Sequence, residues 1–234
     1  MGYDVTYHPI SEDEIQEWYF DVLENIEKLD EIAEQYELNE SNTDRYKEII
    51  KAGLKVTDDE TFDDTHGFYI AIVQGFLRQY FYTRGSAFSF VIDQRDHFET
   101  YTKKWQDIVK HKIVNPINNR ITQNYSSGVY IPYEKVLKLL RVYKYSVDLE
   151  KQYSHKRINV FVKALEYAKN NKLGLLEATE VIEPNVYDLN NSSGYTDFWN
   201  CDHEGPLLYR EAVEDQLREM KMKMEMEKKN KNDK

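Results

Sequence analysis

The chain of 234 residues contains a single cysteine, Cys201. One thiol cannot form a disulfide within the chain, so the sequence excludes a secreted scaffold held together by disulfides. Glycine and proline are also scarce, with nine and five residues. That is too few for a β-sandwich with many tight turns and too few for a disordered chain.

Long hydrophobic runs are missing as well. No apolar stretch approaches the roughly 20 residues of a membrane-spanning helix. The first residues, MGYDVTYHPISEDE, lack the basic and apolar regions of a signal peptide. We therefore expect a cytoplasmic protein with no membrane partner.

The signatures of common catalytic and ligand-binding sites are also missing. The chain has no GxGxxG, P-loop, HExxH or GxSxG motif. Basic residues are interleaved with tyrosines between residues 135 and 163, but the net charge of the chain is −11, so we do not expect a nucleic-acid partner. The sequence predicts no catalytic residues, no cofactor and no bound metal, and it favours a protein that is not an enzyme.

Apolar residues recur mainly at the three- and four-residue spacing of helices. The clearest stripe runs from Ile15 to Ala33, and the capping box Ser11-x-x-Glu14 before it predicts where that helix begins. The same spacing predicts a strongly apolar, central helix over residues 62–83.

The pattern as a whole predicts a mainly α-helical fold. We expect a single compact helical domain of about six to eight helices over residues 1–217, with a short helix over 175–181. A frayed, charged C-terminal tail is expected over residues 218–234. A short strand or hairpin at the N-terminus, over residues 2–9, is an alternative to an extended lead-in.

Charge is distributed unevenly along the chain. Residues 1–66 carry a net charge of −15, residues 67–172 carry +10, and residues 173–234 carry −6. Two interpretations remain open. The acidic and basic helices either pack beside each other and partly neutralise each other, or the acidic residues form a surface that attracts a basic protein partner.

Two segments are candidates for a partner-binding surface. The first is an acidic segment between two predicted helices, and the second is a long polar loop that carries aromatic side chains of the kind common at interfaces. The predicted partner-binding residues are Asp58, Asp59, Glu60, Asp63 and Asp64 in the first segment, and Tyr195, Phe198, Trp199, Asp202 and Glu204 in the second.

Each segment also has an alternative interpretation. Asp63, Asp64 and His66 bring together oxygen and nitrogen atoms that could hold a metal ion, although acidic residues before a helix are common without one. Cys201 and His203 could serve as nucleophile and base, but neighbours in sequence seldom converge on one point. The aromatic loop could dock on the core and contact no partner.

Three segments resemble bacterial polymorphic-toxin immunity proteins, which are small cytosolic proteins. They are GYDVTYHPIS (2–11), EWYFDVL (17–23) and YDLNNSSGYTDFWNCDHEGPLLYREAVEDQL (187–217). The resemblance implies a protein that neutralises a toxin by occluding it, and it supplies no catalytic residues.

The sequence therefore predicts a non-enzymatic binding protein, an immunity-like inhibitor of a bacterial toxin or effector that uses an acidic and aromatic surface. The expected partner is a protein, such as a basic toxin domain. The alternatives are an enzyme with a dispersed metal or Cys/His site and a structural or oligomeric helical protein.

Overall fold

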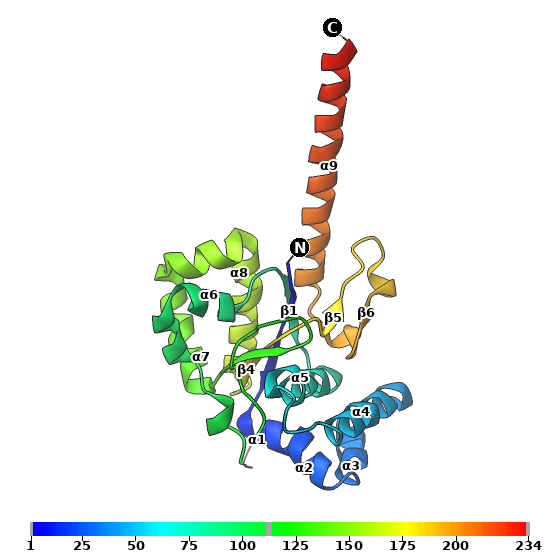
Figure 1. Ribbon diagram of the computed structural model, residues 1–234, viewed down its shortest axis with the longest axis vertical. Helices are drawn as coiled ribbons and strands as arrows, with labels where there is room; N and C mark the ends of the chain where they lie inside the picture. The colour runs from blue at the N-terminus through cyan, green and yellow to red at the C-terminus, as the bar shows by residue number, and fades with distance from the viewer. Residues whose placement is uncertain (1, 111–113, 233–234) are drawn as a thin grey trace.

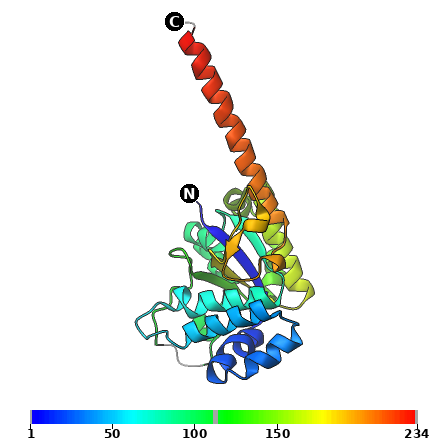
Figure 2. The same ribbon diagram turned by 90° about the vertical axis from the view of Figure 1, so that its right-hand side faces the viewer.

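The computed structural model describes residues 2–110 and 114–232. Its centre is a four-stranded antiparallel sheet with the strand order β2-β1-β4-β3. Helices lie on both sides of this sheet (Figures 1 and 2). The strands are β1 (Asp4–Ile10), β2 (Phe81–Arg84), β3 (Ser127–Ile131) and β4 (Gly174–Thr179).

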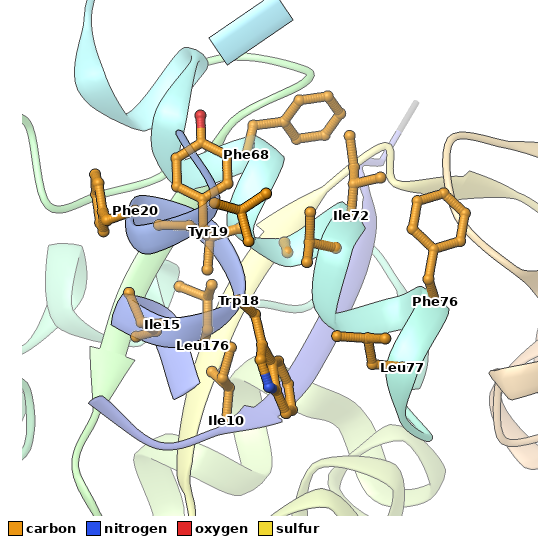
Figure 3. Close-up of a cluster of buried hydrophobic side chains, with 14 of the residues drawn as sticks. Ile10, Ile15, Trp18, Tyr19, Phe20, Phe68, Ile72, Phe76, Leu77 and Leu176 are labelled. Carbon is orange, nitrogen blue, oxygen red and sulfur yellow. The ribbon is translucent and has the colours of Figure 1, made fainter. Parts of the chain in front are cut away.

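The first helical layer is built around the apolar helix α5 (His66–Leu77), which lies against β1 and β4. Leu176 of β4 joins the side chains of this layer in one buried cluster (Figure 3). The other elements of the layer are α1 (Glu12–Ile15), the π-helical turn η1 (Gln16–Phe20), α2 (Asp21–Glu24), α3 (Lys28–Gln35) and α4 (Glu40–Gly53).

The second helical layer covers the opposite face of the sheet. Val5 and Tyr7 of β1 and Leu175 of β4 point into it and share a buried cluster with its helices, as the alternation of side chains along a strand requires. Its elements are α6 (Phe88–Gln94), the 3₁₀ turns η3 (Asp96–Tyr101) and η5 (Tyr143–Tyr145), α7 (Tyr133–Val142) and α8 (Val147–Asn170).

The remaining elements are short, except for the last helix. α9 (Glu204–Asn232) begins against β2 and α8 and then projects away from the rest of the molecule (Figures 1 and 2). The short elements are η2 (Phe62–Asp64), η4 (Trp105–Asp107), β5 (Ile182–Glu183), η6 (Leu189–Asn191), β6 (Ser193–Gly194) and η7 (Phe198–Asn200).

The prediction of a mainly α-helical, all-alpha domain is wrong, because helices and an antiparallel sheet share the core. The segment 175–181, predicted as a helix, is largely strand β4, and the helix predicted to reach residue 83 ends at Leu77 before strand β2. Both strands are buried on both faces. A short strand buried on both faces lacks the alternation of polar and apolar residues of a half-buried strand, so periodicity does not separate it from a buried helix.

Near the N-terminus the capping box and the strand alternative are confirmed, but the single helix predicted from Ile15 to Ala33 is interrupted, since α2 ends at Glu24 and α3 begins at Lys28. The strand considered for the first residues is β1, which lies next to the middle of the sheet. In the capping box, the Glu14 amide donates to Ser11 Oγ at 3.1 Å and the Ser11 amide donates to Glu14 Oε2 at 2.9 Å.

The described part of the expected C-terminal tail is helical, and the frayed tail over residues 218–234 stays a prediction. α9 continues as a helix through Asn232, while residues 233–234 of the predicted tail lie outside the described residues. Among the residues that the structure describes, no helix has both the length and the apolar character that a membrane span needs.

The sheet separates layers of opposite charge. Residues 12–53, which form α1 to α4, carry a net charge of −10, and residues 133–172, which form α7 and α8, carry +6. Ion pairs from Glu12 to Lys103 and from Glu14 to Arg78 connect the first layer to neighbouring segments. The acidic layer thus keeps an outer face of its own, because the basic helices lie on the other side of the sheet.

Candidate partner-binding surface

The two predicted segments lie at opposite ends of helix α4. The acidic residues Asp58, Asp59 and Glu60 are exposed and follow the C-terminal end of α4, and the aromatic loop contacts its N-terminal end. A 14-residue helix is about 20 Å long at 1.5 Å per residue. The two segments therefore lie on the same side of the molecule, and the length of α4 separates them.

The acidic turn, residues 57–60, is held in place by hydrogen bonds from the side chain of Asn115. Asn115 Nδ2 donates hydrogen bonds to the carbonyl oxygens of Thr57 at 2.6 Å and Glu60 at 2.9 Å. The Thr57 amide also donates to Glu60 Oε1 at 2.9 Å. These bonds fix the backbone of the turn while the carboxylates of Asp58 and Asp59 stay in solvent.

Asp63 differs from these exposed acids because its side chain is fully buried. Its carboxylate accepts hydrogen bonds from the backbone amides of Asn118 at 2.6 Å and Asn119 at 3.1 Å. Burial raises the pKa of Asp63 to about 6, and the two backbone bonds act in the opposite direction. Asp63 fastens the 115–119 segment to the start of α5 and offers little surface to a partner.

Asp64 is half-buried, and burial raises its pKa while a hydrogen bond from the Gln123 side chain lowers it. This contact brings the acidic segment next to the loop that contains Tyr125. Tyr125 was not among the predicted site residues, yet its ring lies beside that of Tyr195.

An aromatic cluster joins α5, the loop of Tyr125 and the loop of Tyr195. The ring centroid of Phe68, on α5, lies 6.2 Å from that of Tyr125 and 5.6 Å from that of Tyr195, and the two tyrosine centroids are 5.9 Å apart. Phe68 is buried, whereas Tyr125 and Tyr195 are 42% and 48% exposed. We call Phe68, Tyr125 and Tyr195 the tyrosine patch.

Carboxylates lie at the margin of the tyrosine patch. Tyr125 Oη donates a hydrogen bond of 3.4 Å to the exposed Glu183, and the charge of Glu183 is the main cause that raises the pKa of Tyr125. Tyr69, the residue after Phe68, lines a hollow with Glu48 and Glu60. Aromatic rings and acidic groups thus share this side of the molecule.

The aromatic loop is docked on the helices. Asn42 Nδ2 donates to Asp197 Oδ2 at 2.7 Å, and Arg45 donates to the carbonyl oxygen of Gly194 at 2.8 Å. Thr196 Oγ1 donates to the Ile72 carbonyl oxygen at 2.7 Å. The expectation that the loop either folds onto the core or presents aromatic residues therefore has a mixed outcome, because its backbone is anchored while some rings stay exposed.

Trp199 is the most exposed aromatic side chain among the predicted partner-binding residues, at 73%, whereas Phe198 is half-buried against the core. Trp199 borders a polar hollow of about 330 Å³ between α4 and the loop. The hollow is also lined by Asn39, Ser41, Asn42, Arg45 and Ser192.

The last two predicted residues form ion pairs within the chain. Lys163 of α8 lies 2.8 Å from Asp202 and 3.1 Å from Glu204. These pairs attach the start of α9 to α8. Asp202 and Glu204 therefore stay candidates for partner contact, but a partner would have to compete with Lys163.

The alternative catalytic residues are engaged elsewhere. Cys201 is buried, and burial raises the pKa of its thiol well above the usual value, while His203 next to it is exposed. A buried, protonated thiol is a poor nucleophile. The pair does not have the features of an activated nucleophile and its base.

His66 is part of an aromatic setting. Its Nδ1 lies 2.8 Å from Tyr19 Oη, and its ring lies beside Phe20 and Phe62. Burial lowers its pKa. In the described part of the chain, no group of three or more His, Cys, Asp or Glu side chains is arranged to hold a metal ion.

Sequence reasoning missed three residues of this surface: Phe68, Tyr125 and Glu183. Phe68 lies in the segment 62–83, which the sequence predicts as a central apolar helix, and its side chain is buried. Tyr125 is an aromatic residue in the polar segment before β3, which is the same kind of signal that selected Tyr195. Only the folded chain shows that the two loops meet.

No protein-family model, curated protein or solved structure matches this chain in the three comparisons.

Proposed function

We propose that the protein is a non-enzymatic, cytoplasmic binding protein, an immunity-like inhibitor that neutralises a bacterial toxin or effector by occluding it. The observation that carries this proposal is the tyrosine patch, in which two rings stay about half exposed on a docked, hydrogen-bonded scaffold. Tyrosine and tryptophan are enriched among the residues that dominate binding energy at protein interfaces.

The backbone at Tyr125 adds support. Its φ angle is +58°, in the left-handed region that costs a residue with a side chain about 1–2 kcal/mol. A bulky ring in this conformation is a poor choice for stability alone. Residues held at such a cost cluster at functional sites, so the inference runs from this conformation to a binding role.

Charge suggests the kind of partner. Glu183 lies beside Tyr125, Glu60 lines a hollow with Tyr69, and α1 to α4 add a net charge of −10 on the same side of the sheet. An acidic field steers a basic protein toward the surface and raises the association rate. A basic toxin domain fits this surface, and the aromatic rings would supply the contact energy.

The test is a growth-rescue assay with the genes that neighbour the gene of this chain. A neighbouring gene whose expression stops growth is co-expressed with this chain, with the double variant Tyr125→Ala/Tyr195→Ala, or with Tyr145→Ala. Tyr145 is the matched control because its ring is 86% exposed and lies in η5, in the basic layer.

The proposal expects the unsubstituted chain and the Tyr145 variant to restore growth and the patch variant to fail. If none of the neighbouring genes is toxic, or if the patch variant restores growth as well as the control, the proposed function is wrong.

A further inference from the structure

In the outer part of α9, from Glu214 onward, the described side chains (214–227) are all exposed. The first turns of α9 are fixed to the body by Leu208, by stacking of Arg84 on the Tyr209 ring at 5.2 Å, and by an ion pair of 3.0 Å between Lys156 and Glu211. From Glu214 onward, the ion pairs among the described side chains join residues of α9 to each other. The helix then continues through Asn232, about 27 Å further at 1.5 Å per residue.

A solvated helix of this length is marginal in water unless something packs on it. The outer part of α9 also exposes five large apolar side chains, which are Leu217, Met220, Met222, Met224 and Met226. Exposed apolar residues at regular spacing on a helix that already projects from the body indicate a contact surface.

Some of these side chains form a seam. Val213, Leu217, Met220 and Met224 follow each other at spacings of four, three and four residues. This is the spacing of the a and d positions of a coiled coil, which keeps side chains on one face of a helix. Met222 and Met226 are rotated by about half a turn from this seam at 100° per residue.

The charge of α9 changes sign along its length. Residues 204–219 carry a net charge of −3, and residues 220–232 carry +3. The helix dipole favours acids at the beginning and bases at the end of a helix, but only within the first and last turn. It does not account for Glu214, Asp215, Lys221 and Lys223 in the middle.

We propose that α9 pairs with α9 of a second copy of this chain, antiparallel, along the Val213–Leu217–Met220–Met224 seam. Antiparallel pairing places the acidic half of each helix against the basic half of the other. Parallel pairing would place like charges together along the whole length. The two-fold symmetry of such a contact makes every favourable pair occur twice.

One register satisfies the seam completely. When Leu217 lies opposite the partner's Met220, Val213 lies opposite the partner's Met224, and the same two pairs recur by symmetry. In that register Glu214 flanks the partner's Lys221, and Arg210 lies opposite the partner's Glu227. All apolar positions of the seam are then matched with apolar positions and the adjoining charges with opposite charges.

The experiment is sedimentation equilibrium on the full chain over a concentration range of about 1–100 μM. In this range a dimer with a micromolar dissociation constant dissociates measurably. The unsubstituted chain is compared with the seam variant Leu217→Lys/Met220→Lys and with the control Met222→Lys/Met226→Lys. Both variants add two lysines to the same exposed stretch of helix, so they differ only in the face that they change.

The proposal expects a dimer for the unsubstituted chain and the control. For the seam variant it expects a dimer dissociation constant at least about a hundredfold higher, because each substitution places a buried charge in the seam twice. A second pair of variants tests the direction of pairing. Glu214→Lys is expected to weaken the dimer, and Glu214→Lys/Lys221→Glu is expected to restore it, since both charges of each cross-pair are then exchanged.

A monomer at every concentration overturns the proposal. Equal weakening by the seam and control variants overturns the assigned face, and failure of the charge exchange to restore the dimer overturns the antiparallel register. This test is independent of the proposed inhibitor function, because the substitutions lie in the projecting part of α9.

Discussion

The rings of Tyr125 and Tyr195 meet edge to face on the surface, with centroids 5.9 Å apart and an interplanar angle of 81°. The two residues come from different loops, and each also contacts Phe68 of α5 beneath them. Edge-to-face packing is a favoured arrangement of aromatic rings. The contact thus gives the exposed patch a defined shape before any partner binds, which lowers the entropic cost of binding.

A substitution at Tyr125, whose backbone is left-handed, distinguishes a binding role of this residue from a structural role. Asparagine tolerates this conformation better than tyrosine, so Tyr125→Asn recovers backbone energy while it loses ring contacts of about 0.5–1.5 kcal/mol. We expect the free energy of unfolding, measured by denaturant titration, to change by less than about 1 kcal/mol. A loss of several kcal/mol would mean that Tyr125 is kept for the stability of the fold, and it would contradict the binding role inferred from its conformation.

The acidic segment contains residues with different roles, which substitutions can separate. Asp63→Ala removes the acceptor of two backbone amides in a buried site, and leaving buried donors unpaired costs about 1–3 kcal/mol each. We expect a destabilisation of about 2–4 kcal/mol, read from the shift of the denaturation midpoint.

Asp58→Ala is the matched control for this prediction, because Asp58 is exposed in the same segment. An exposed substitution of this kind changes stability by less than about 0.5 kcal/mol. Equal effects of the two substitutions would contradict the structural role of Asp63.

Glu177 gives stability a pH dependence with a defined sign. Its buried carboxylate accepts hydrogen bonds from the amides of Phe88 at 2.7 Å and Ser89 at 3.2 Å, and burial raises its pKa from 4.5 to about 7. Because the folded chain holds this proton more tightly than the unfolded chain, Glu177 lowers stability as the pH rises from about 4.5 to about 7.

The variant Glu177→Gln has no proton to lose at this position. Its free energy of unfolding, relative to that of the unsubstituted chain, should therefore increase by about 3 kcal/mol between pH 4.5 and pH 8, at about 1.4 kcal/mol per pKa unit. Urea titrations at several pH values measure this difference. A constant difference across the range would show that the pKa of Glu177 is the same in the folded and unfolded chain.

Cys201 tests the alternative in which the chain is an enzyme with a Cys/His site. Its side chain is 3% exposed, and burial raises its pKa, so the folded protein should react with a disulfide reagent at least about a hundredfold more slowly than the denatured protein at pH 8. Fast reaction of the folded protein would restore the catalytic alternative for Cys201 and His203.

How far the sequence predicts the fold depends on whether the determining contacts are local. The capping box of Ser11 and Glu14 could be predicted, because the side chain of each residue accepts a hydrogen bond from the backbone amide of the other, three positions away. Strand β4 could not, because both its faces are buried and Glu177 in its middle resembles the polar face of a helix. The partners of Glu177 lie at the start of α6, which only the tertiary structure brings close.

The candidate surface follows the same rule. Tyr195 could be selected from its loop alone, because an aromatic residue in a long polar segment needs a reason. Asp63 was selected with its exposed neighbours, since composition does not distinguish a solvated acid from one that binds backbone amides. The meeting of Tyr125 and Tyr195 depends on where two loops cross α5, and no spacing in the sequence encodes it.

Titration calorimetry of the purified chain against the toxin domain whose toxicity it relieves measures what the tyrosine patch contributes to binding. The account predicts that Tyr125→Ala/Tyr195→Ala weakens binding by at least about 2 kcal/mol, a typical effect of removing central aromatic residues from an interface. Tyr145→Ala should leave the affinity unchanged. Unchanged affinity of the patch variant would contradict the account, because the partner would then bind elsewhere on the molecule.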